Sequence, residues 1–441
     1  MSGLLRPTYN YEMSVKSKKD DQVLILFTKA AFVLLLMGLI TSLCVRSAVA
    51  IDYFEITSPK FVPVKVGLIK GMETEVAEVQ KVFKDNLEKV LYFQIIEGTK
   101  EDFAQSEEVV FLLGMLLNKN PYQLEINLWR HDEELPAYQK VIILKETNKL
   151  RDTGILLADW FVSKTLNFKG VSKSKIAYTA QKTNRRKNIM LSSYDGTVQK
   201  RFSYNLGSNN LASWSFDNKN ILYTTFTRSS VQLTIQPSIR LRAKILSFPS
   251  AFQPLGASWR IDGESILLTL MKKGNSDIYS YNLKNAKLEK IFAWKSLETS
   301  PQMSQDGQKI AFVSDSASPN RPQIYVYNLL NRKTERVTFR GSYNSSPKWS
   351  PDATQLIYER QVKGVFQLFK YTLHNRRHTQ LTFGRYDSEK PDWSPNGKQI
   401  VFSAKKGNVS KLYYISAFGG RTIRVTTNDN NIEETNPVWS K

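Results

Sequence analysis

The chain is poor in the residues that carry most enzymatic and metal chemistry. Its 441 residues include 1 cysteine and 3 histidines. The cysteine, Cys44, lies in an N-terminal segment that we expect to be removed, so the mature chain would hold no thiol. This excludes a disulfide framework, a cysteine nucleophile and a thiolate metal site. A cysteine-free exported protein suits an oxidising compartment.

Motifs for hydrolysis, phosphate binding and metal binding are missing as well. No Gly-x-Ser-x-Gly sequence occurs, which argues against the hydrolases that join a propeller to a catalytic domain. His374 and His378 lie beside two arginines with no nucleophile in evidence. His131 and the three acidic residues after it precede Pro136, which is typical of a solvated turn rather than a metal site. We therefore assign no catalytic, cofactor or metal residue and predict that the protein is not an enzyme.

Residues 1–50 have the pattern of an export signal. Lysines at 16, 18 and 19 precede an apolar run from Ala30 to Ile40, and the segment ends in Ala48-Val49-Ala50, a small-x-small cleavage pattern. The run is short for a membrane span. We interpret residues 1–50 as a cleaved signal peptide, and an uncleaved membrane anchor is the alternative.

Charge is distributed unevenly along the chain. Residues 51–170 carry 15 basic and 19 acidic side chains, whereas residues 171–441 carry 41 and 18. A strongly basic region attracts acidic partners. For an exported chain, an acidic protein, an anionic envelope polymer or a lipid surface fits better than nucleic acid, and a merely solvated basic surface is the alternative.

Residues 51–170 are expected to form a small mixed α/β domain. Apolar residues at helical spacing predict a helix over Glu73–Val90, and Thr153 is placed to cap a second helix that ends at Thr165. Runs of β-forming residues predict the strands. They are Val64–Ile69, Tyr92–Ile96, Glu108–Leu117, 124–128 and Val141–Leu144.

A sixfold repeat dominates residues 171–441. Five tryptophans and one methionine follow one another at intervals of 45, 44, 46, 44 and 46 residues, and a turn phrase such as Trp349-Ser350-Pro351-Asp352 recurs with a β-run after it. A period near 45 residues with short strands is typical of a β-propeller. The repeat positions are Trp214, Trp259, Met303, Trp349, Trp393 and Trp439.

The ends of the repeat predict how the ring closes. Lys175–Thr179 resembles the second strand of a blade but has no Trp phrase before it, and the missing strand is supplied by 436–441. Pairing of the C-terminal strand with the first blade would remove an unpaired sheet edge. We therefore predict an all-β six-bladed propeller, in which the repeated Trp packs between blades. The blades are 175–205 with 436–441, 211–249, 256–292, 300–339, 346–383 and 390–427.

Loops that lead into the innermost strands of a propeller ring the mouth of its central channel, and loops on a rigid scaffold are common recognition sites. Basic residues surround them, namely Arg340, Lys348, Arg385 and Lys390. Such a mouth would suit an acidic protein surface. The partner-binding residues predicted there are Asn209, Asn210, Gly256, Thr299, Ser300, Ser345, Ser346, Ser388, Glu389, Glu434 and Thr435.

Three features of the sequence resemble the TolB family. They are the repeated Pro-x-Trp-Ser-Pro-Asp phrase, Ser193-Tyr194-Asp195-Gly196, and the terminal Asn436-Pro437-Val438-Trp439-Ser440. Proteins of that family are the periplasmic component of the Tol–Pal cell-envelope system. The resemblance covers nearly the whole chain and includes the order of signal, α/β domain and propeller. Met303 and Asn218 depart from its usual Trp and Gly, and the chain is unusually basic.

The resemblance implies a cofactor-free periplasmic adaptor that supports outer-membrane integrity and constriction during cell division. It would act as a monomer that reaches the membrane through its partners: a Pal-like lipoprotein at the propeller mouth, and a TolA-like protein at the segment after the signal. An ordinary mobile terminus is the alternative for that segment. The rival function is binding of an anionic envelope polymer or glycan through the basic face. The TolA-contacting residues would be Ile51, Tyr53, Phe54 and Ile56.

Overall fold

The computed structural model of the chain describes residues 62–104, 106, 108–130, 133–144, 149–182, 185–238, 242–292, 294–427 and 430–441. The predicted signal peptide, the segment 51–60 with its proposed TolA contacts, and His131 with Asp132 lie outside the described residues. Across these described ranges, no helix is long and apolar enough to cross a membrane.

The first part of the described chain is a mixed five-stranded sheet with helices. The strand order is β2-β1-β3-β4-β5, in which β1 pairs in parallel with β2 and β3, and β3-β4-β5 is antiparallel. This agrees with the predicted mixed α/β region. The elements are β1 (Val64–Ile69), α2 (Thr74–Val90), β2 (Phe93–Gly98), α3 (Lys100–Ala104), β3 (Val109–Lys119), β4 (Tyr122–Arg130), β5 (Tyr138–Ile143) and α4 (Leu150–Thr165).

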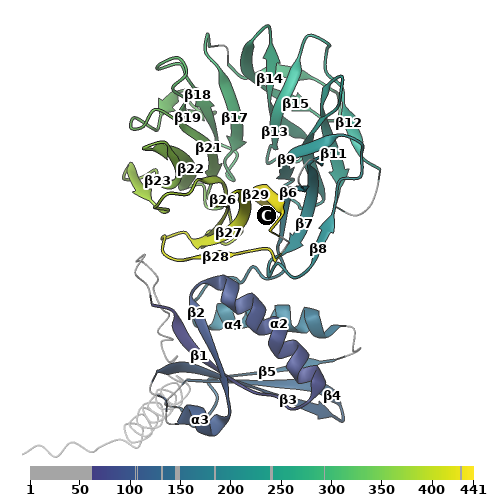
Figure 1. Cartoon of the computed structure of the whole chain (residues 1–441), viewed down its shortest axis with the longest axis vertical. Helices are drawn as coiled ribbons and strands as arrows, with labels where there is room; N and C mark the ends of the chain where they lie inside the picture. The colour runs from purple at the N-terminus through teal and green to yellow at the C-terminus, as the bar shows by residue number, and fades with distance from the viewer. Residues whose placement is uncertain are drawn as a thin grey trace, which may run out of the picture. The chain divides into compact units, whose positions relative to one another are not determined.

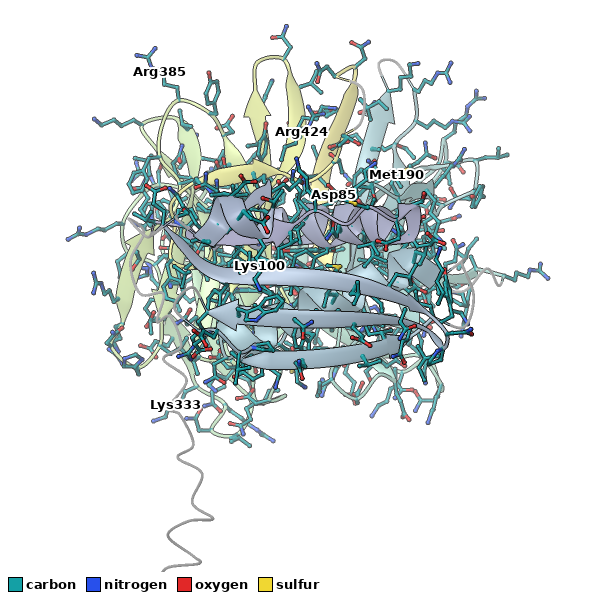
Figure 2. The ribbon with its side chains drawn as sticks, turned by 90° about the horizontal axis from the view of Figure 1, so that it is seen from below. Asp85, Lys100, Met190, Lys333, Arg385 and Arg424 are labelled. Carbon is teal, nitrogen blue, oxygen red and sulfur yellow. The ribbon has the colours of Figure 1, made fainter. Side chains whose placement is uncertain are left out.

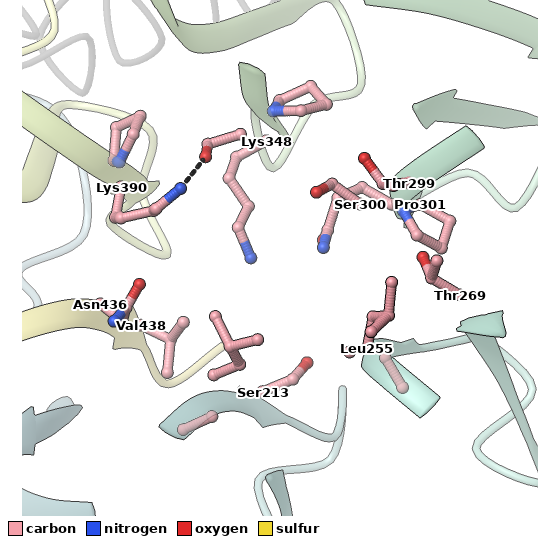
Figure 3. Close-up of a pocket in the computed structure, with 18 of the residues that line it drawn as sticks. Ser213, Leu255, Thr269, Thr299, Ser300, Pro301, Lys348, Lys390, Asn436 and Val438 are labelled. Atoms are coloured by element: carbon pink, nitrogen blue, oxygen red, sulfur yellow. Dashed lines mark hydrogen bonds between the residues drawn. The ribbon is translucent and has the colours of Figure 1, made fainter. Parts of the chain in front are cut away.

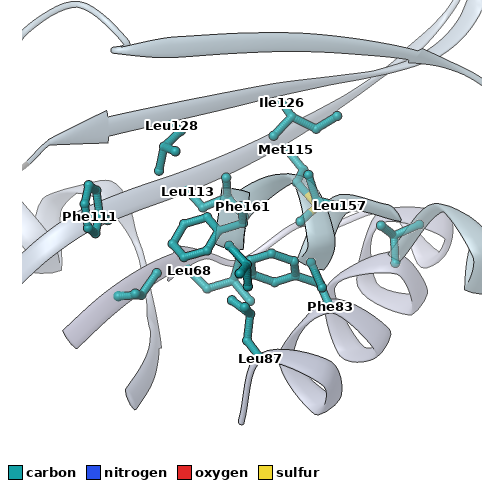
Figure 4. Close-up of a cluster of buried hydrophobic side chains, with 14 of the residues drawn as sticks. Leu68, Phe83, Leu87, Phe111, Leu113, Met115, Ile126, Leu128, Leu157 and Phe161 are labelled. Atoms are coloured by element: carbon teal, nitrogen blue, oxygen red, sulfur yellow. The ribbon is translucent and has the colours of Figure 1, made fainter. Parts of the chain in front are cut away.

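Aromatic side chains from both long helices and the sheet form the core of this region (Figure 4). Phe161 of α4 makes edge contacts with Phe83 of α2, at 5.6 Å between ring centroids, and with Phe93 at 5.2 Å. All three side chains are fully buried, so each contributes roughly 2–3 kcal/mol of hydrophobic free energy to folding. The stripe predicted over Glu73–Val90 is the face that α2 turns into this core.

Two local details of this region differ from the sequence prediction. Helix α4 begins at Leu150, so Thr153 lies inside its first turn and its hydroxyl donates to the Lys149 carbonyl (3.1 Å) instead of capping the helix. A polar side chain that bonds the backbone four residues earlier is an alternative to a cap. The short helix α3 was not predicted, because five residues are too few to show a helical period.

Residues 175–439 form six four-stranded antiparallel sheets arranged around a centre (Figure 1). Each sheet is one propeller blade, and its innermost strand carries the repeated Trp or Met. The predicted six-bladed architecture is confirmed. The blades are β29 (Ile432–Trp439) with β6 (Lys175–Lys182), β7 (Asn188–Ser193) and β8 (Gln199–Arg201); β9 (Ser208–Trp214), β10 (Asn220–Phe226), β11 (Val231–Pro237) and β12 (Lys244–Leu246); β13 (Gln253–Trp259), β14 (Ser265–Lys272), β15 (Asn275–Asn282) and β16 (Leu288–Lys290); β17 (Glu298–Met303), β18 (Lys309–Ser314), β19 (Gln323–Asn328) and β20 (Thr334–Arg336); β21 (Asn344–Trp349), β22 (Gln355–Val362), β23 (Val365–Thr372) and β24 (Arg377–Gln380); and β25 (Ser388–Trp393), β26 (Gln399–Lys406), β27 (Val409–Ser416) and β28 (Thr422–Arg424).

The C-terminal strand closes the ring as predicted. β29 pairs antiparallel with β6, with Trp439 opposite Ile176, and Figure 1 shows the two strands side by side. Trp439 is fully buried and stacks on Tyr414 of the last blade at 4.9 Å between ring centroids. Its backbone N–H also donates to Asp392 on β25 (2.8 Å). The last strand therefore joins the first blade to the sixth.

The repeated phrase has a structural explanation at each of its two ends. The indole N–H of Trp349 donates to the Gln302 carbonyl of the preceding blade (3.1 Å), and Trp259 and Trp393 make the same bond to their preceding blades. In the turn that follows, Ser215 Oγ donates to Asp217 (2.6 Å). The Trp thus joins neighbouring blades, and the Ser-x-Asp turn fixes the exit from the innermost strand.

Candidate functional site: the mouth of the propeller channel

The innermost strand of every blade contains a β-bulge, at the same place in five of the six. In those five the register with the second strand shifts just before the repeated Trp or Met, for example between Ser345 and Lys348. In the blade of Trp259 it shifts slightly earlier, between Pro254 and Gly256. A bulge bends its strand and leaves one residue unpaired. Each blade therefore presents an unpaired stretch of its innermost strand to the ring, at equivalent positions in five of the six blades.

The residue three positions before the repeated Trp or Met is held in the left-handed region in five of the six blades. This conformation costs a non-glycine residue roughly 1–2 kcal/mol. Strain of this kind clusters at ligand-binding sites in proteins. The sixth blade has Gly256 at this position, without the left-handed φ. The five residues are Leu211 (φ 55°), Ser300 (53°), Ser346 (54°), Lys390 (51°) and Asn436 (49°).

The six bulges surround a cavity of about 230 Å³, which we call the channel mouth (Figure 3). The five strained residues and Gly256 all line it, together with the next residue of each strand. In four blades that next residue is proline, which has no amide proton to leave unpaired at the bulge. These prolines are Pro301, Pro347, Pro391 and Pro437.

A buried carboxylate organises one side of the channel mouth. Glu359 of β22 is 3% exposed and accepts hydrogen bonds from Ser345 Oγ (2.6 Å) and Ser346 Oγ (2.9 Å). Lys390 donates to it twice, from its backbone N–H (2.8 Å) and from Nζ (3.2 Å). Lys390 Nζ also donates to Ser346 Oγ (2.9 Å), and Figure 3 draws a dashed line from the ammonium of Lys390.

The pKa values of this ion pair move apart in the directions that keep both groups charged. Burial would raise the pKa of Glu359, but Lys390 and the hydrogen bonds from the serines hold it below its ordinary value. Burial would lower the pKa of Lys390, but the Glu359 carboxylate holds it above its ordinary value. The charge of Lys390 is therefore neutralised locally.

Lys348 is held differently. Its side chain points into the middle of the channel mouth in Figure 3, and no hydrogen bond or ion pair is found for its ammonium among the described residues. Burial lowers its pKa, the carboxylate of Asp392 opposes that change, and Lys441 and Lys390 add to it. Asp392 is itself occupied by the Trp439 N–H and lies 3.9 Å from Lys441 Nζ. Among the described residues Lys348 thus has no ion-pair partner, and Asp392 is the carboxylate that acts on its pKa.

The predicted mouth residues separate into three groups. All of them lie within the innermost strands rather than in loops, because the bulge itself turns the chain toward the channel. Lining the cavity are Gly256, Thr299, Ser300 and Ser346. Half-buried beside it are Asn210, Glu389 and Thr435. Buried within the blades are Asn209, Ser345, Ser388 and Glu434.

The buried group supports the site from behind. Asn209 accepts from Thr225 Oγ1 (2.8 Å) and donates to Asn205 (2.8 Å), so its amide is used inside the blade. Glu434 accepts from Thr426 Oγ1. At the rim of the mouth, Asn210 receives hydrogen bonds from Thr179 (2.7 Å) and Asn436 (2.9 Å).

Sequence reasoning did not select Leu211 and Asn436, although both line the channel mouth. The repeat predicts both positions, because Leu211 and Asn436 each lie three residues before a repeated Trp, as Ser346 does, and as Ser300 lies three residues before Met303. Of the four basic residues expected near the mouth, the cavity lining includes Lys348 and Lys390 but not Arg340 or Arg385. Within the described ranges, no group of three or more His, Cys, Asp or Glu side chains is placed to hold a metal ion.

Comparison with known proteins identifies the propeller. Residues 163–441 match the model of the TolB beta propeller domain. The Tol-Pal system protein TolB of Ruthia magnifica subsp. Calyptogena magnifica is 29% identical over 192 residues, which are 41% of this chain and 44% of that protein. The protein of the same name from Vesicomyosocius okutanii subsp. Calyptogena okutanii is 29% identical over 184 residues, covering 39% and 42%. The matched segments thus span less than half the length of these relatives.

Among solved structures, TolB from Acinetobacter baumannii has the same fold. It superimposes with a TM-score of 0.73 over 88% of this chain and 99% of its own, at 18% sequence identity. At 18% identity this structural similarity shows the fold alone. The family assignment rests instead on the sequence match, which extends over 279 residues of this chain. The chain belongs to the TolB β-propeller family.

Proposed function

We propose that the protein is a periplasmic, non-enzymatic adaptor of a Tol–Pal-type envelope system, and that its channel mouth binds a Pal-like lipoprotein. One observation carries the proposal: equivalent bulges of five blades hold strained residues around a single opening, which Gly256 of the remaining blade completes. A rigid ring that fixes its contact residues in advance loses little conformational entropy when it binds. The family membership and the names of its relatives support the choice of partner.

The charge of the channel mouth suggests what the partner presents. Lys348 is partly desolvated and has no ion-pair partner among the described residues, so a carboxylate from the partner would gain a charge-assisted contact there. The small polar side chains of Ser300 and Thr299 can accept or donate hydrogen bonds around it. An acidic segment that enters the opening fits this arrangement better than a neutral one.

The remaining parts of the proposal rest on the family resemblance. The segment after the predicted signal would contact a TolA-like inner-membrane protein, and binding there and at the mouth would be linked through the order of that segment. Such an adaptor would support outer-membrane integrity and constriction during cell division. It would work as a monomer and reach the membrane through its partners.

The proposal is tested by capture from solubilised envelope with the purified protein and its Ser300→Arg variant. Ser300 is exposed in the channel mouth, so an arginine there adds bulk without disturbing the blade interior. We expect recovery of a Pal-like lipoprotein to fall at least about tenfold, as for a central interface residue. The matched control is Gln308→Arg, which adds the same charge at an exposed turn after the other end of β17.

Three outcomes are informative. Loss with Ser300→Arg but not with Gln308→Arg places the contact in the channel mouth. Equal recovery by all three proteins would retain the lipoprotein as partner and reject the mouth as its site. Recovery of an anionic polymer alone, lost at high salt, would reject the adaptor function in favour of polymer binding.

A further inference from the structure

A second basic cavity lies away from the channel, between the outer strands of two neighbouring blades. It has a volume of about 840 Å³ and is lined by residues from the end of β20 and from β22, β23 and β24. It shares no lining residue with the channel mouth. We call it the arginine cavity, because its charged residues are Arg336, Arg340, Arg360, Arg376 and Glu335, and His378 lies beside them.

Only one arginine of this cavity is paired with a carboxylate. Arg376 lies 3.1 Å from Glu335, and both side chains are largely exposed. For Arg336, Arg340 and Arg360, no ion pair is found among the described residues. The cavity therefore holds more positive charge than its own acidic residue can balance.

Neutral partners orient two of these arginines. Arg360 is buried, donates from Nε to Asn344 (2.9 Å) and from NH2 to the Tyr358 hydroxyl (2.8 Å), and packs over the Phe369 ring at 4.4 Å. Arg336 donates from Nε to the Thr338 carbonyl (2.7 Å). These bonds fix where the guanidinium groups lie but provide no negative charge.

Arg340 is not held in this way: it is exposed at the cavity, and no hydrogen bond from its side chain is found in the described part of the chain. The positive charge of Arg340 nevertheless acts on two less exposed groups of the cavity, Arg360 and His378. Burial lowers the pKa of Arg360 and of His378, and the positive charge of Arg340 lowers both further. The cavity is thus an assembly of mutually repelling cations, and an anion between them would relieve that repulsion.

The chemistry of the lining suggests the kind of anion. Guanidinium groups present planar pairs of N–H donors that match phosphate and carboxylate oxygens. Three arginines without a carboxylate call for more than one negative charge, and a phosphate monoester supplies about 1.5–2 charges and three acceptor oxygens from one group. Phe339, which is 70% exposed at the same cavity, offers an apolar surface for the organic part of the ester.

We propose that the arginine cavity binds a phosphate monoester, with Arg340 and Arg336 at the opening and Arg360 at the buried side. The phosphate group could belong to a small soluble molecule or to a lipid headgroup, and both would use the same donors. This site is independent of the lipoprotein contact proposed above, since the two cavities share no lining residue.

Equilibrium titration of the full chain with inorganic phosphate and with glycerol phosphate, at about 0.15 M salt to screen diffuse attraction, tests the proposal. We expect saturable binding that weakens at least about tenfold in Arg340→Ala, as for loss of a charge-assisted hydrogen bond. Arg340→Lys should restore less than half of the lost affinity, because an ammonium cannot form the paired contact. The control is Arg385→Ala, since Arg385 is exposed, lies outside the cavity and points outward in Figure 2.

The side chain of His378 gives an independent readout. A bound phosphate should raise the pKa of His378, measured by NMR and assigned with His378→Gln, in the parent protein and not in Arg340→Ala. Recruitment to phosphatidic acid vesicles, but not to phosphatidylcholine vesicles, would identify the lipid source, and binding of glycerol phosphate alone would identify the soluble one. Equal weakening by Arg340→Ala and Arg385→Ala, or no saturable binding of any phosphate, would overturn the proposal.

Discussion

The channel mouth and the arginine cavity are both positively charged, but the protein holds the charge in different ways. In the mouth, Lys390 is matched by the buried carboxylate of Glu359, and Lys348 has no ion-pair partner among the described residues. In the arginine cavity the one carboxylate, Glu335, is exposed and pairs with a rim arginine. The comparison indicates that the shape of the channel mouth, with the one charge of Lys348, would determine what binds there. In the arginine cavity the positive charge itself would determine what binds.

The two sites also differ in how they arise from the sequence. The mouth is built from equivalent positions of a repeat, so the backbone of all six blades determines its shape. The arginine cavity occurs between two blades only and depends on individual side chains. A substitution at the mouth therefore changes one sixth of a ring, while loss of one arginine removes a large part of the cavity's charge.

The largest expected effect that separates the two sites is on stability. Glu359→Gln removes the charge that Lys390 and two serines face, and should lower the free energy of unfolding by about 2 kcal/mol. This is below the cost of breaking a fully buried pair because the Lys390 side chain is 41% exposed. Urea unfolding measures it.

The matched substitution in the other cavity is Glu335→Gln. There the pair with Arg376 is solvent-exposed, so the expected loss is below about 0.5 kcal/mol. Equal losses in the two variants would contradict the distinction between a buried structural pair at the mouth and a surface pair at the cavity.

The same contrast explains what could be predicted from the sequence. The six blades, the closing strand and the channel followed from the spacing of Trp214 to Trp439, because a repeat averages out local ambiguity. The sequence did not predict which polar residues face the channel, since a bulge shifts the alternation of the strand by one residue. Ser300 is exposed in the channel mouth, whereas Ser345 is buried. The arginine cavity was not predicted at all. His378 was predicted to lie in a basic turn but belongs to β24, and Arg340 from the loop after β20 and Arg360 from β22 line the same cavity.

Acid titration should affect the two sites in different pH ranges. The pKa of His378 is lowered in the folded protein, so its contribution to stability is complete above its unfolded value near 6.5 and is lost as the pH falls below that value. The pKa of Glu359 is also lowered, but from 4.5, so its contribution is lost only at lower pH. Unfolding free energies measured from pH 7.5 to 3.5 should therefore fall in two stages.

Variants assign the two stages. His378→Gln should flatten the curve between about pH 7 and 5.5, and Glu359→Gln should flatten it below about pH 4.5. If His378→Gln left the upper stage unchanged, the lowering of the pKa of His378 by burial and by the charges of Arg360 and Arg340 would not contribute to that stage.

The smallest expected effect concerns the strained ring of the channel mouth. Ser300 has φ 53°, a conformation that costs a non-glycine residue at least about 1 kcal/mol, whereas glycine adopts it freely but loses roughly 0.5 kcal/mol more chain entropy on folding. Ser300→Gly should therefore raise the free energy of unfolding by about 0.5 kcal/mol. Ser342→Gly, at an exposed loop serine without a left-handed φ, should instead lower it slightly.

The two glycine variants, compared by urea unfolding, also test why the strain persists. If Ser300→Gly stabilises the protein but weakens capture of the lipoprotein, the serine is kept for its contact and the ring carries strain for the sake of binding. If Ser300→Gly and Ser342→Gly destabilise the protein equally, the bulge imposes no strain at Ser300. In four blades the mouth would then owe its shape to Pro301 and its equivalents, whose rings fix the backbone at the bulge.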